Sequence, residues 1–274
     1  MRATRFLIMA VAGAAALASQ PAFAAPLLAP HRAVYDLALE SASDRSGISG
    51  ISGRMVYEFN GSACEGYTVS FRFVTQIETS DVSRLTDQQT TTFEDGEGKN
   101  FSFVTKSFVD QNLDKEVRGN ATISEEATKV ELESPEEEEI ELAGTQFPTQ
   151  HLIELIEKAE KGETFYETTL FDGSEDADRV LTTTVIVGKQ AVAEQNDPEA
   201  PAMGALEPDR FWPANIAYFD GKEGGGEELP TYQISFKLHD NGVTRDLVMD
   251  YGEFAMKGRL VDLALFDAPD DCVQ

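Results

Sequence analysis

Apolar and polar residues alternate along most of the chain, a period-two pattern that is typical of β-strands with one buried face. The stretch YTVSFRFV, residues 67–74, shows it clearly. Its apolar members all fall on one face of the expected strand: Tyr67, Val69, Phe71 and Phe73. The polar residues between them take the other face. This alternation predicts an antiparallel strand with one dry side and one side in water.

Similar alternating runs recur along the sequence, at residues 32–39, 54–59, 101–108 and 232–238. Turn signals separate the runs: Asn60-Gly61, residues 94–100, Asp172-Gly173, Asp220-Gly221 and Asn241-Gly242. The last of these stands between two alternating runs and predicts a tight hairpin. We count about fourteen candidate strands, and an open twisted sheet rarely exceeds about ten. The pattern therefore predicts an all-β fold, one large antiparallel sheet that curls on itself.

Residues 147–163 break this alternation with apolar residues at helical spacing. The expected buried stripe is Leu152, Leu155, Ile156 and Ala159. Thr149 is the expected N-cap, Lys158 and Lys161 fall in the last turn, and Gly162 is the expected stop. A narrow apolar stripe must pack on another element. We expect this helix to lie on the concave face of the sheet.

Two stretches predict loops with freedom to move, residues 193–209 and residues 219–230. The first is rich in Pro, Ala and acidic residues, and the second contains three consecutive glycines. The acidic run 133–142 is too short to predict a disordered tail, and Ile140 and Leu142 continue the alternation within it.

Residues 1–24 have the features of a cleaved export signal. Arg2 and Arg5 precede the apolar run 6–17, and Ala22-Phe23-Ala24 fits the small-x-small cleavage pattern. The apolar run is shorter than the roughly 20 residues that a transmembrane helix needs. We expect residues 25–274 to form the mature chain, to function in the periplasm and to contain no transmembrane segment.

The formal net charge of −27 limits the possible partners. Binding to nucleic acids or to anionic lipid surfaces depends on Lys and Arg, and such polyanions repel a strongly acidic protein. We therefore expect no nucleic-acid partner. Acidity of this kind favours solubility and self-repulsion.

Candidate metal ligands occur, but not at the spacing of a metal site. Glu136 to Glu139 are consecutive, and neighbours on a strand point to opposite faces, so a solvated edge is the favoured interpretation. Asp95 and Glu97 lack the spacing of a calcium loop and predict a hairpin turn. Zinc sites usually have ligand pairs at short spacing, which the three histidines, His31, His151 and His239, do not form. We expect structural histidines and no metal or other cofactor.

Motifs for nucleophilic catalysis are also missing from the sequence. Residues 172–176 (DGSED) form a turn signal rather than the strand-to-helix elbow of a serine hydrolase. The lone Trp212 either lines a ligand pocket or packs under the sheet, and packing is favoured. An enzyme acting on envelope polymer would need a cleft with paired carboxylates, and no pair stands out. We therefore predict a protein without enzymatic activity.

The chain contains two cysteines, Cys64 and Cys272. An exported chain with an even number of cysteines usually pairs them, and two cysteines allow one intramolecular bridge. The alternative is a free thiol or an intermolecular bond. The bridge would fix the C-terminal tail to an early strand, and an oxidised Cys64 would have no nucleophilic thiolate.

Several segments, taken together, resemble the EipB family of periplasmic cell-envelope integrity proteins. They are HRAVYDLAL, GRMVYEFNGSACEGY, TTTFEDGEGKNFSF, FPTQHLIELIEKA, LFDGSED, VTRDLVMDYGEF and the C-terminal cysteine. They extend from about His31 to Cys272 in the family's order. The resemblance implies a single domain over residues 25–274, a spiral-like, broken β-barrel of about fourteen antiparallel strands around one helix. It also implies a periplasmic location and an internal disulfide, here between Cys64 and Cys272.

The resemblance further implies a role in maintaining the cell envelope under stress, without known enzymatic activity. It implies a functional link to a periplasmic tetratricopeptide-repeat protein. The family's fold is similar to periplasmic carriers of lipids and lipoproteins. The leading hypothesis is therefore a non-enzymatic envelope-integrity factor that acts through protein contacts. The alternative is a carrier of lipid or lipoprotein acyl chains in a curved apolar sheet.

Overall fold

The computed structural model describes residues 28–125, 127–204, 206, 210–220 and 229–267. In this part of the chain, fifteen strands form one antiparallel sheet, accompanied by one α-helix and one short 3-10 helix. The first meander consists of β1 (His31–Ala42), β2 (Ile48–Ser62), β3 (Gly66–Thr79), β4 (Ser83–Glu94), β5 (Asn100–Val109), β6 (Asn112–Ile123), β7 (Ala127–Ser134) and β8 (Glu138–Ala143). The remaining elements are α1 (Pro148–Glu160), β9 (Phe165–Leu170), β10 (Leu181–Val187), β11 (Ala191–Val192), the 3-10 helix Ala200–Ala202, β12 (Arg210–Phe219), β13 (Tyr232–Leu238), β14 (Thr244–Asp250) and β15 (Phe254–Leu265).

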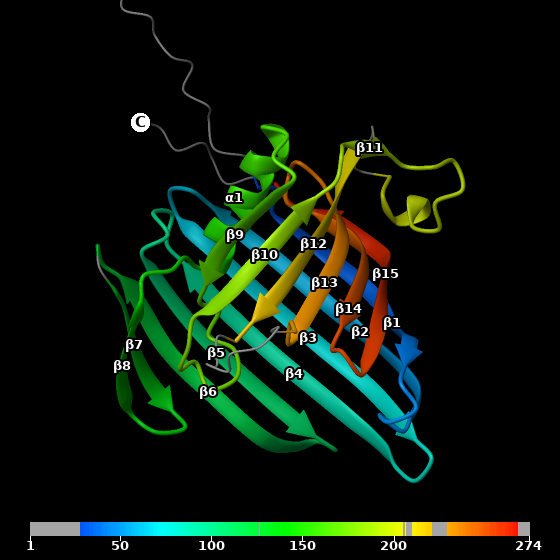
Figure 1. Cartoon of the computed structure of the whole chain (residues 1–274), viewed down its shortest axis with the longest axis horizontal. Coiled ribbons are helices and arrows are strands. Elements are labelled where there is room, and N and C mark those ends of the chain that lie inside the picture. Colours follow the sequence, from blue (N-terminus) through cyan, green and yellow to red (C-terminus); the bar gives the residue numbers. More distant parts are fainter. Residues whose placement is uncertain (1–27, 126, 205, 207–209, 221–228, 268–274) are drawn as a thin grey trace, which may run out of the picture.

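The sheet has the strand order β8-β7-β6-β5-β4-β3-β2-β1-β15-β14-β13-β12-β10-β9, and β11 pairs with β12 outside this path. Two meanders therefore meet where β1 pairs with β15, shown side by side in blue and red (Figure 1). The path contains fourteen strands, which confirms the all-β fold expected from the sequence. Long antiparallel neighbours along the chain need only short turns, and this connectivity explains the regular spacing of turn signals.

Hydrogen-bonded pairing does not continue from β8 to β9, so the curled sheet is a broken barrel rather than a closed one. Backbone contact between the two ends is local in the described residues. Gln146, which follows β8, forms an isolated parallel bridge with Leu170 of β9, and the Phe171 N–H donates to the Gln146 carbonyl at 3.0 Å.

Aromatic packing holds this break together where ladder hydrogen bonds do not. Phe101 stacks on Phe147 with ring centroids 4.9 Å apart, and Phe103 meets Phe171 edge-on at 5.8 Å. These four side chains are at most 1% exposed and form the centre of a second, smaller core. The rings come from β5, from Phe147 directly before α1 and from Phe171 directly after β9, so the start of the helix and the end of β9 are both attached to the first meander.

The larger core lies on the inner face of the curled sheet, between α1 and most of the strands. Leu155 and Ile156 of α1 are completely buried in it, and Ala159 is 5% exposed. Leu152 packs against the same core from its rim. The predicted apolar stripe is therefore the face with which α1 contacts the sheet.

Details of the helix and of one turn differ from the sequence-based predictions. Thr149 is not the N-cap: the cap is Phe147, which makes no side-chain cap hydrogen bond, and the helix starts at Pro148. Gly162 follows the helix with φ of +76° and ends it as expected. The turn predicted at Asn60-Gly61 is displaced, because Gly61 still pairs with Tyr67 and residues 63–65 form the turn.

The loops predicted to move have different outcomes. Residues 193–204 carry no long element, as expected, but Asp197, Glu199 and Met203 are buried, so this part is held against the body. Of the second loop, residues 221–228 lie outside the described residues, as does the predicted signal peptide. Among the helices in the described ranges, none has both the length and the apolar character needed to cross a membrane.

Candidate functional site

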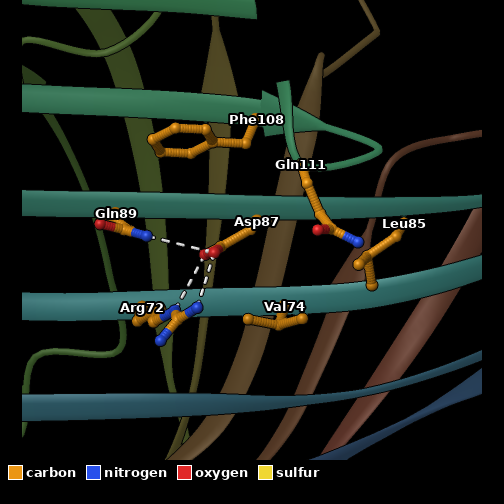
Figure 2. A pocket seen from close by; sticks show the side chains of 7 residues that line it. All are labelled: Arg72, Val74, Leu85, Asp87, Gln89, Phe108 and Gln111. Carbon is orange, nitrogen blue, oxygen red and sulfur yellow. Dashed lines mark hydrogen bonds and ion pairs between the residues drawn. The ribbon is translucent and has the colours of Figure 1, made fainter. Parts of the chain in front are cut away.

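A hollow of about 230 Å³ opens on the outer face of β3, β4 and β5, the face opposite the cores. We call it the outer-face hollow; it is lined by Arg72, Val74, Leu85, Asp87, Gln89, Phe108 and Gln111 (Figure 2). Register explains why these side chains meet: Arg72 lies opposite Gln89, and Asp87 opposite Phe108, on neighbouring strands. Three apolar residues, Val74, Leu85 and Phe108, occupy outward positions here that are elsewhere mostly polar.

An ion pair crosses the floor of the outer-face hollow. Arg72 Nη2 lies 2.7 Å from Asp87 Oδ2 and its Nε lies 3.0 Å from Oδ1, a bidentate arrangement. Gln89 donates a third hydrogen bond to Asp87 at 3.1 Å. The hydrogen bond from Arg72 lowers the pKa of Asp87. The carboxylate is therefore ionised and satisfied at neutral pH, and the apolar side chains around it are left for contact.

The β5–β6 turn fixes one side of the outer-face hollow. Asp110 and Gln111 both have positive φ, +50° and +68°, as a tight two-residue hairpin requires. The Asp110 N–H donates to the Leu85 carbonyl at 2.9 Å, and the Leu85 N–H donates to Oδ1 of Asp110 at 3.0 Å. The turn is thus anchored to β4, and Gln111 is held beside Leu85 (Figure 2).

Basic residues on the outer face of β1–β6 are neutralised by acidic neighbours. Five such pairs cross this face or its borders: Arg32–Asp262, Arg54–Asp36, Arg72–Asp87, Lys106–Glu116 and Arg118–Glu133. A second hollow of about 300 Å³ lies over β3–β7 on the same face, where Phe93 is 40% exposed. In a chain of net charge −27, this face offers compensated charges and apolar contact area.

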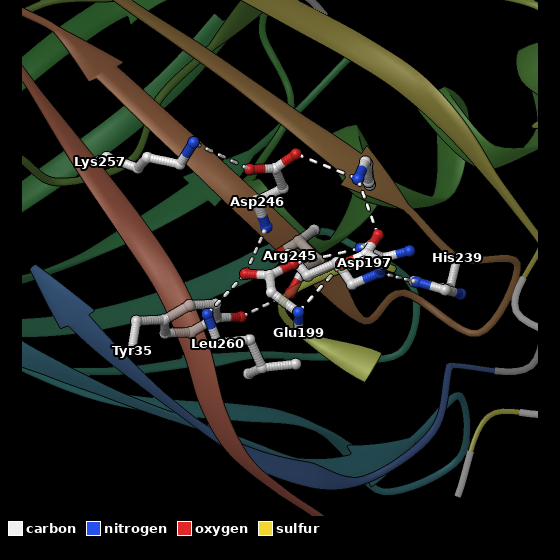
Figure 3. Close-up of polar contacts among 10 residues, drawn as sticks. Tyr35, Asp197, Glu199, His239, Arg245, Asp246, Lys257 and Leu260 are labelled. Carbon is white, nitrogen blue, oxygen red and sulfur yellow. Dashed lines mark hydrogen bonds and ion pairs between the residues drawn. The ribbon is translucent and has the colours of Figure 1, made fainter. Parts of the chain in front are cut away.

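A charged cluster lies on β13 and β14 where residues 197–199 pack against these strands. We define it as Asp197, Glu199, His239, Arg245 and Asp246, labelled in Figure 3, together with Lys237. Arg245 Nη1 donates to Oδ2 of Asp197 at 2.8 Å and to Oε2 of Glu199 at 3.2 Å. Its Nε lies 3.3 Å from Nε2 of His239. The side chains of Asp197, Glu199 and Arg245 are exposed by 4%, 2% and 0%.

Glu199 also joins two strands at this point. Its Oε1 accepts the backbone N–H groups of Asp246, at 3.1 Å, and of Leu260, at 2.6 Å. Asp246 has φ of +53°, an unfavourable conformation for a residue other than glycine, next to an irregularity in β13–β14 pairing. The charged cluster therefore stabilises a local departure from regular sheet by satisfying its backbone donors.

The ionisation of Asp197 follows from its partners. Burial by itself raises its pKa, but hydrogen bonds from the Glu199 N–H, Arg245 and Lys237 outweigh burial and lower the pKa to about 2. Lys237 Nζ lies 3.1 Å from both Asp197 and Asp246. Because the charges of Asp197, Glu199 and Arg245 are paired and buried, the cluster is suited to fixing residues 197–199 on the sheet rather than to binding substrate.

A further buried carboxylate belongs to Glu94 at the end of β4, which is 2% exposed. Its two oxygens accept the backbone N–H groups of Thr149, at 2.7 Å, and of Gln150, at 3.0 Å. Burial is the largest influence and raises the pKa of Glu94 to about 7, although these donors act in the opposite direction. A side chain from a distant strand thus replaces the missing N-cap of α1.

The three histidines predicted to be structural occupy separate buried surroundings. His31 Nδ1 lies 2.8 Å from the Ala29 carbonyl, and its ring lies beside Tyr57 and Phe59. His151 Nε2 lies 3.1 Å from Oγ1 of Thr183. Burial lowers the pKa of His31 and lowers that of His151 to about 4. His239 belongs to the charged cluster, so the three are not brought together.

The remaining candidates also have defined positions. Trp212 is 6% exposed and packs in the larger core on β12. Glu136 to Glu139 are exposed around the β7–β8 turn, and Asp95 receives the Lys99 N–H at 2.8 Å in the β4–β5 turn. Across the described ranges, no group of three or more acidic, histidine or cysteine residues is arranged to hold a metal ion.

Cys64 lies in the β2–β3 turn and is exposed. Cys272 lies outside the described residues, so the bridge between them stays a prediction.

Sequence reasoning missed Glu94, Asp197, Glu199 and Arg245. A signal for two of them was present in the alternation. The alternation assigns Glu94 and Arg245 to the face of their strands where it otherwise places apolar or uncharged side chains. A charge on that face requires a buried partner. The partners Asp197 and Glu199 carry no comparable signal, because they belong to a proline-containing loop without periodicity.

Comparison with known proteins agrees with this architecture. The chain matches the family described as EipB-like over residues 22–267. It is 57% identical over 266 residues to the cell envelope integrity protein EipB of Brucella abortus (strain 2308), an alignment that covers 97% of this chain and 92% of the relative. The chain is also similar to a solved crystal structure, that of a beta-barrel-like protein of a domain of unknown function from Brucella abortus, with 58% sequence identity. It superimposes with a TM-score of 0.86 over 89% of this chain and 100% of the other. The chain therefore belongs to the EipB-like family.

Proposed function

We propose that this protein maintains the integrity of the cell envelope from the periplasm and that it acts by contact with another protein, without catalysis. Family membership and the relative named cell envelope integrity protein EipB support the envelope role. The predicted export signal supports the periplasmic location.

The outer-face hollow is the observation that carries the contact mechanism. Val74, Leu85 and Phe108 surround a satisfied Arg72–Asp87 pair. Protein interfaces are typically enriched in aromatic residues and Arg at an apolar centre with few uncompensated charges. These residues lie on the side of the sheet opposite the cores, so their role in folding is smaller than that of inward residues. The partner class favoured by the family resemblance is a periplasmic tetratricopeptide-repeat protein.

Complementation of a deletion strain tests this proposal. The doubly substituted protein Leu85→Asp/Phe108→Asp should fail to restore resistance to detergents and cell-wall antibiotics, because two buried charges at an interface prevent docking. Val82→Asp is the matched control: it is 54% exposed in the adjoining β3–β4 turn and outside the hollow, and it should restore resistance. Circular dichroism must show that both purified variants are folded. Full resistance with the double variant would contradict the contact mechanism.

A second candidate, a carrier of acyl chains, is favoured by a row of aromatic rings that continues from the larger core to the surface. Tyr218, Tyr232, Tyr251 and Phe254 follow one another with ring centroids 5.4, 5.0 and 4.9 Å apart. Tyr251 at the β14–β15 turn is 39% exposed. Native mass spectrometry of protein isolated from the periplasm should then show a bound acyl compound. Its repeated absence, with no binding of a fluorescent fatty acid, would exclude this candidate.

A further inference from the structure

The first turn of α1 depends on a carboxylate that is distant in sequence. The helix has no side-chain cap of its own, and the two N–H groups of Thr149 and Gln150 point to the oxygens of Glu94. The N-terminus of a helix carries a partial positive charge and unpaired N–H groups. Glu94 therefore supplies the hydrogen bonds that join this end of α1 to β4.

The surroundings of Glu94 contain no opposing cation. Tyr57 of β2 and Tyr67 of β3 are the ionisable neighbours from the adjacent strands, and both have pKa values raised by burial. Asp95 follows directly and raises the pKa of Glu94 further. Among the described residues, no Lys or Arg forms an ion pair with Glu94, and the nearby Lys99 pairs with Glu97 at 2.7 Å.

Two histidines lie near this region but are occupied elsewhere. His31 of β1 faces Tyr57 and Phe59, and its Nδ1 contacts the Ala29 carbonyl. His151 of α1 contacts Thr183 of β10. Neither provides a positive charge to Glu94 at neutral pH, because burial lowers the pKa of both rings.

Protonation changes what Glu94 offers to the helix. A carboxylate accepts both N–H groups, one on each oxygen. A neutral carboxyl group keeps one good acceptor, the carbonyl oxygen, while its hydroxyl becomes a donor. We propose that Glu94 is a pH-responsive latch on α1: the ionised form holds the N–H groups of both Thr149 and Gln150, and the neutral form holds one of them.

The pH range follows from the folded state. The pKa of Glu94 is raised to about 7 from an ordinary value of 4.5. The folded protein binds the proton of Glu94 more tightly than the unfolded chain does. The stability that this proton contributes is therefore complete below pH 4.5 and is lost as the pH rises through about 7. Near neutral pH, ionisation of Glu94 therefore gains one hydrogen bond to α1 and at the same time creates a buried charge, which lowers the stability of the folded protein.

Nuclear magnetic resonance of the full mature protein tests the latch directly. The Glu94 carboxyl carbon and the backbone amides of Thr149 and Gln150 should shift together between pH 5 and pH 9, with one common midpoint near 7. In Glu94→Gln, the two amides should lose this titration. Glu97→Gln is the control, because Glu97 lies in the adjacent turn with a side chain that is 75% exposed, and it should leave the titration unchanged.

Stability gives a second measurement. Between pH 5 and pH 8, the unfolding equilibrium constant of the wild type should rise relative to that of Glu94→Gln by about tenfold or more. If Glu94→Gln does not fold, the wild-type titration alone decides. Amides of Thr149 and Gln150 that do not titrate in this range, that follow a midpoint below pH 5.5, or that still titrate in Glu94→Gln would overturn the proposal.

Discussion

Nη1 of Arg245 donates a hydrogen bond of 2.8 Å to Oδ2 of Asp197, and the two side chains are only 0% and 4% exposed (Figure 3). The two residues are 48 positions apart. A loop that would otherwise be bound by few apolar contacts is thereby fixed to the middle of the second meander. The pair is costly to bury, but removing one partner costs more, because the other charge is left unpaired.

Replacing Arg245 by Met should lower the free energy of unfolding by about 3–5 kcal/mol, since Glu199 would remain buried without a cation and Asp197 would keep only the partly exposed Lys237. Urea unfolding at neutral pH measures the change. Arg259→Met on the neighbouring strand β15 is the control, because Arg259 is exposed, and it should change stability by less than about 0.5 kcal/mol. Equal effects of the two substitutions would contradict the role of the charged cluster.

Acid should weaken the same cluster. The pKa of Asp197 is lowered in the folded state to about 2 from 3.8, so its contribution is complete above pH 4 and is lost as the pH falls through 2. The stability difference between wild type and Asp197→Asn, measured by urea unfolding at pH 6, 4 and 2.5, should therefore shrink as the pH falls. A difference that is constant over this range would show that the charge of Asp197 is not involved.

The phenylalanine cluster at the break in the barrel should be sensitive to truncation. Phe147→Ala should destabilise the protein by about 3–5 kcal/mol, because the ring is fully buried and stacks on Phe101. Phe93→Ala is the comparison, since Phe93 is 40% exposed on the outer face, and it should cost much less. Thermal unfolding followed by circular dichroism distinguishes the two. If both variants melt at the wild-type temperature, packing does not hold the break together.

The predicted Cys64–Cys272 bridge has a simple test by mutation. Cys64→Ser and Cys272→Ser should destabilise the protein to similar extents, by about 2–5 kcal/mol, and the double variant should be no worse than either. Mass spectrometry of the oxidised protein after proteolysis should show the linked peptides. If only one substitution has an effect, the two cysteines are not paired with each other.

Alternation by itself identified most of the strands, because one face of an antiparallel strand is buried and the period is two. The runs 32–39, 67–74 and 232–238 lie within β1, β3 and β13, and Asn241-Gly242 is the turn between β13 and β14. The prediction of a turn at Asn60-Gly61 was wrong, because Gly61, with φ of +113°, still pairs with Tyr67 in the β2–β3 ladder. Local turn propensity was outweighed there by continued pairing.

Buried charged residues were the main part of the candidate site that the sequence pattern did not predict. The period-two pattern places Arg245 in β14 and Glu94 in β4, but it does not indicate which groups these charges contact. Their partners lie 48 and 55 positions away. Hydrogen bonding between such distant groups depends on how the two meanders and α1 are packed, which no local pattern contains.

The amino-acid sequence was enough to predict the all-β class, the position of the single long helix within the described chain, the outward solvation of the acidic run and the strong net negative charge. These properties follow from local periodicity and composition. The folded chain was needed to see that β1 pairs with β15, that Phe147 and Phe171 fill the break between β8 and β9, and that Glu94 caps α1. The physical reason is that each contact, whether strand pairing, ring packing or a hydrogen bond, joins residues that are distant in sequence. The curl of the sheet brings them together, and this curl depends on the whole chain.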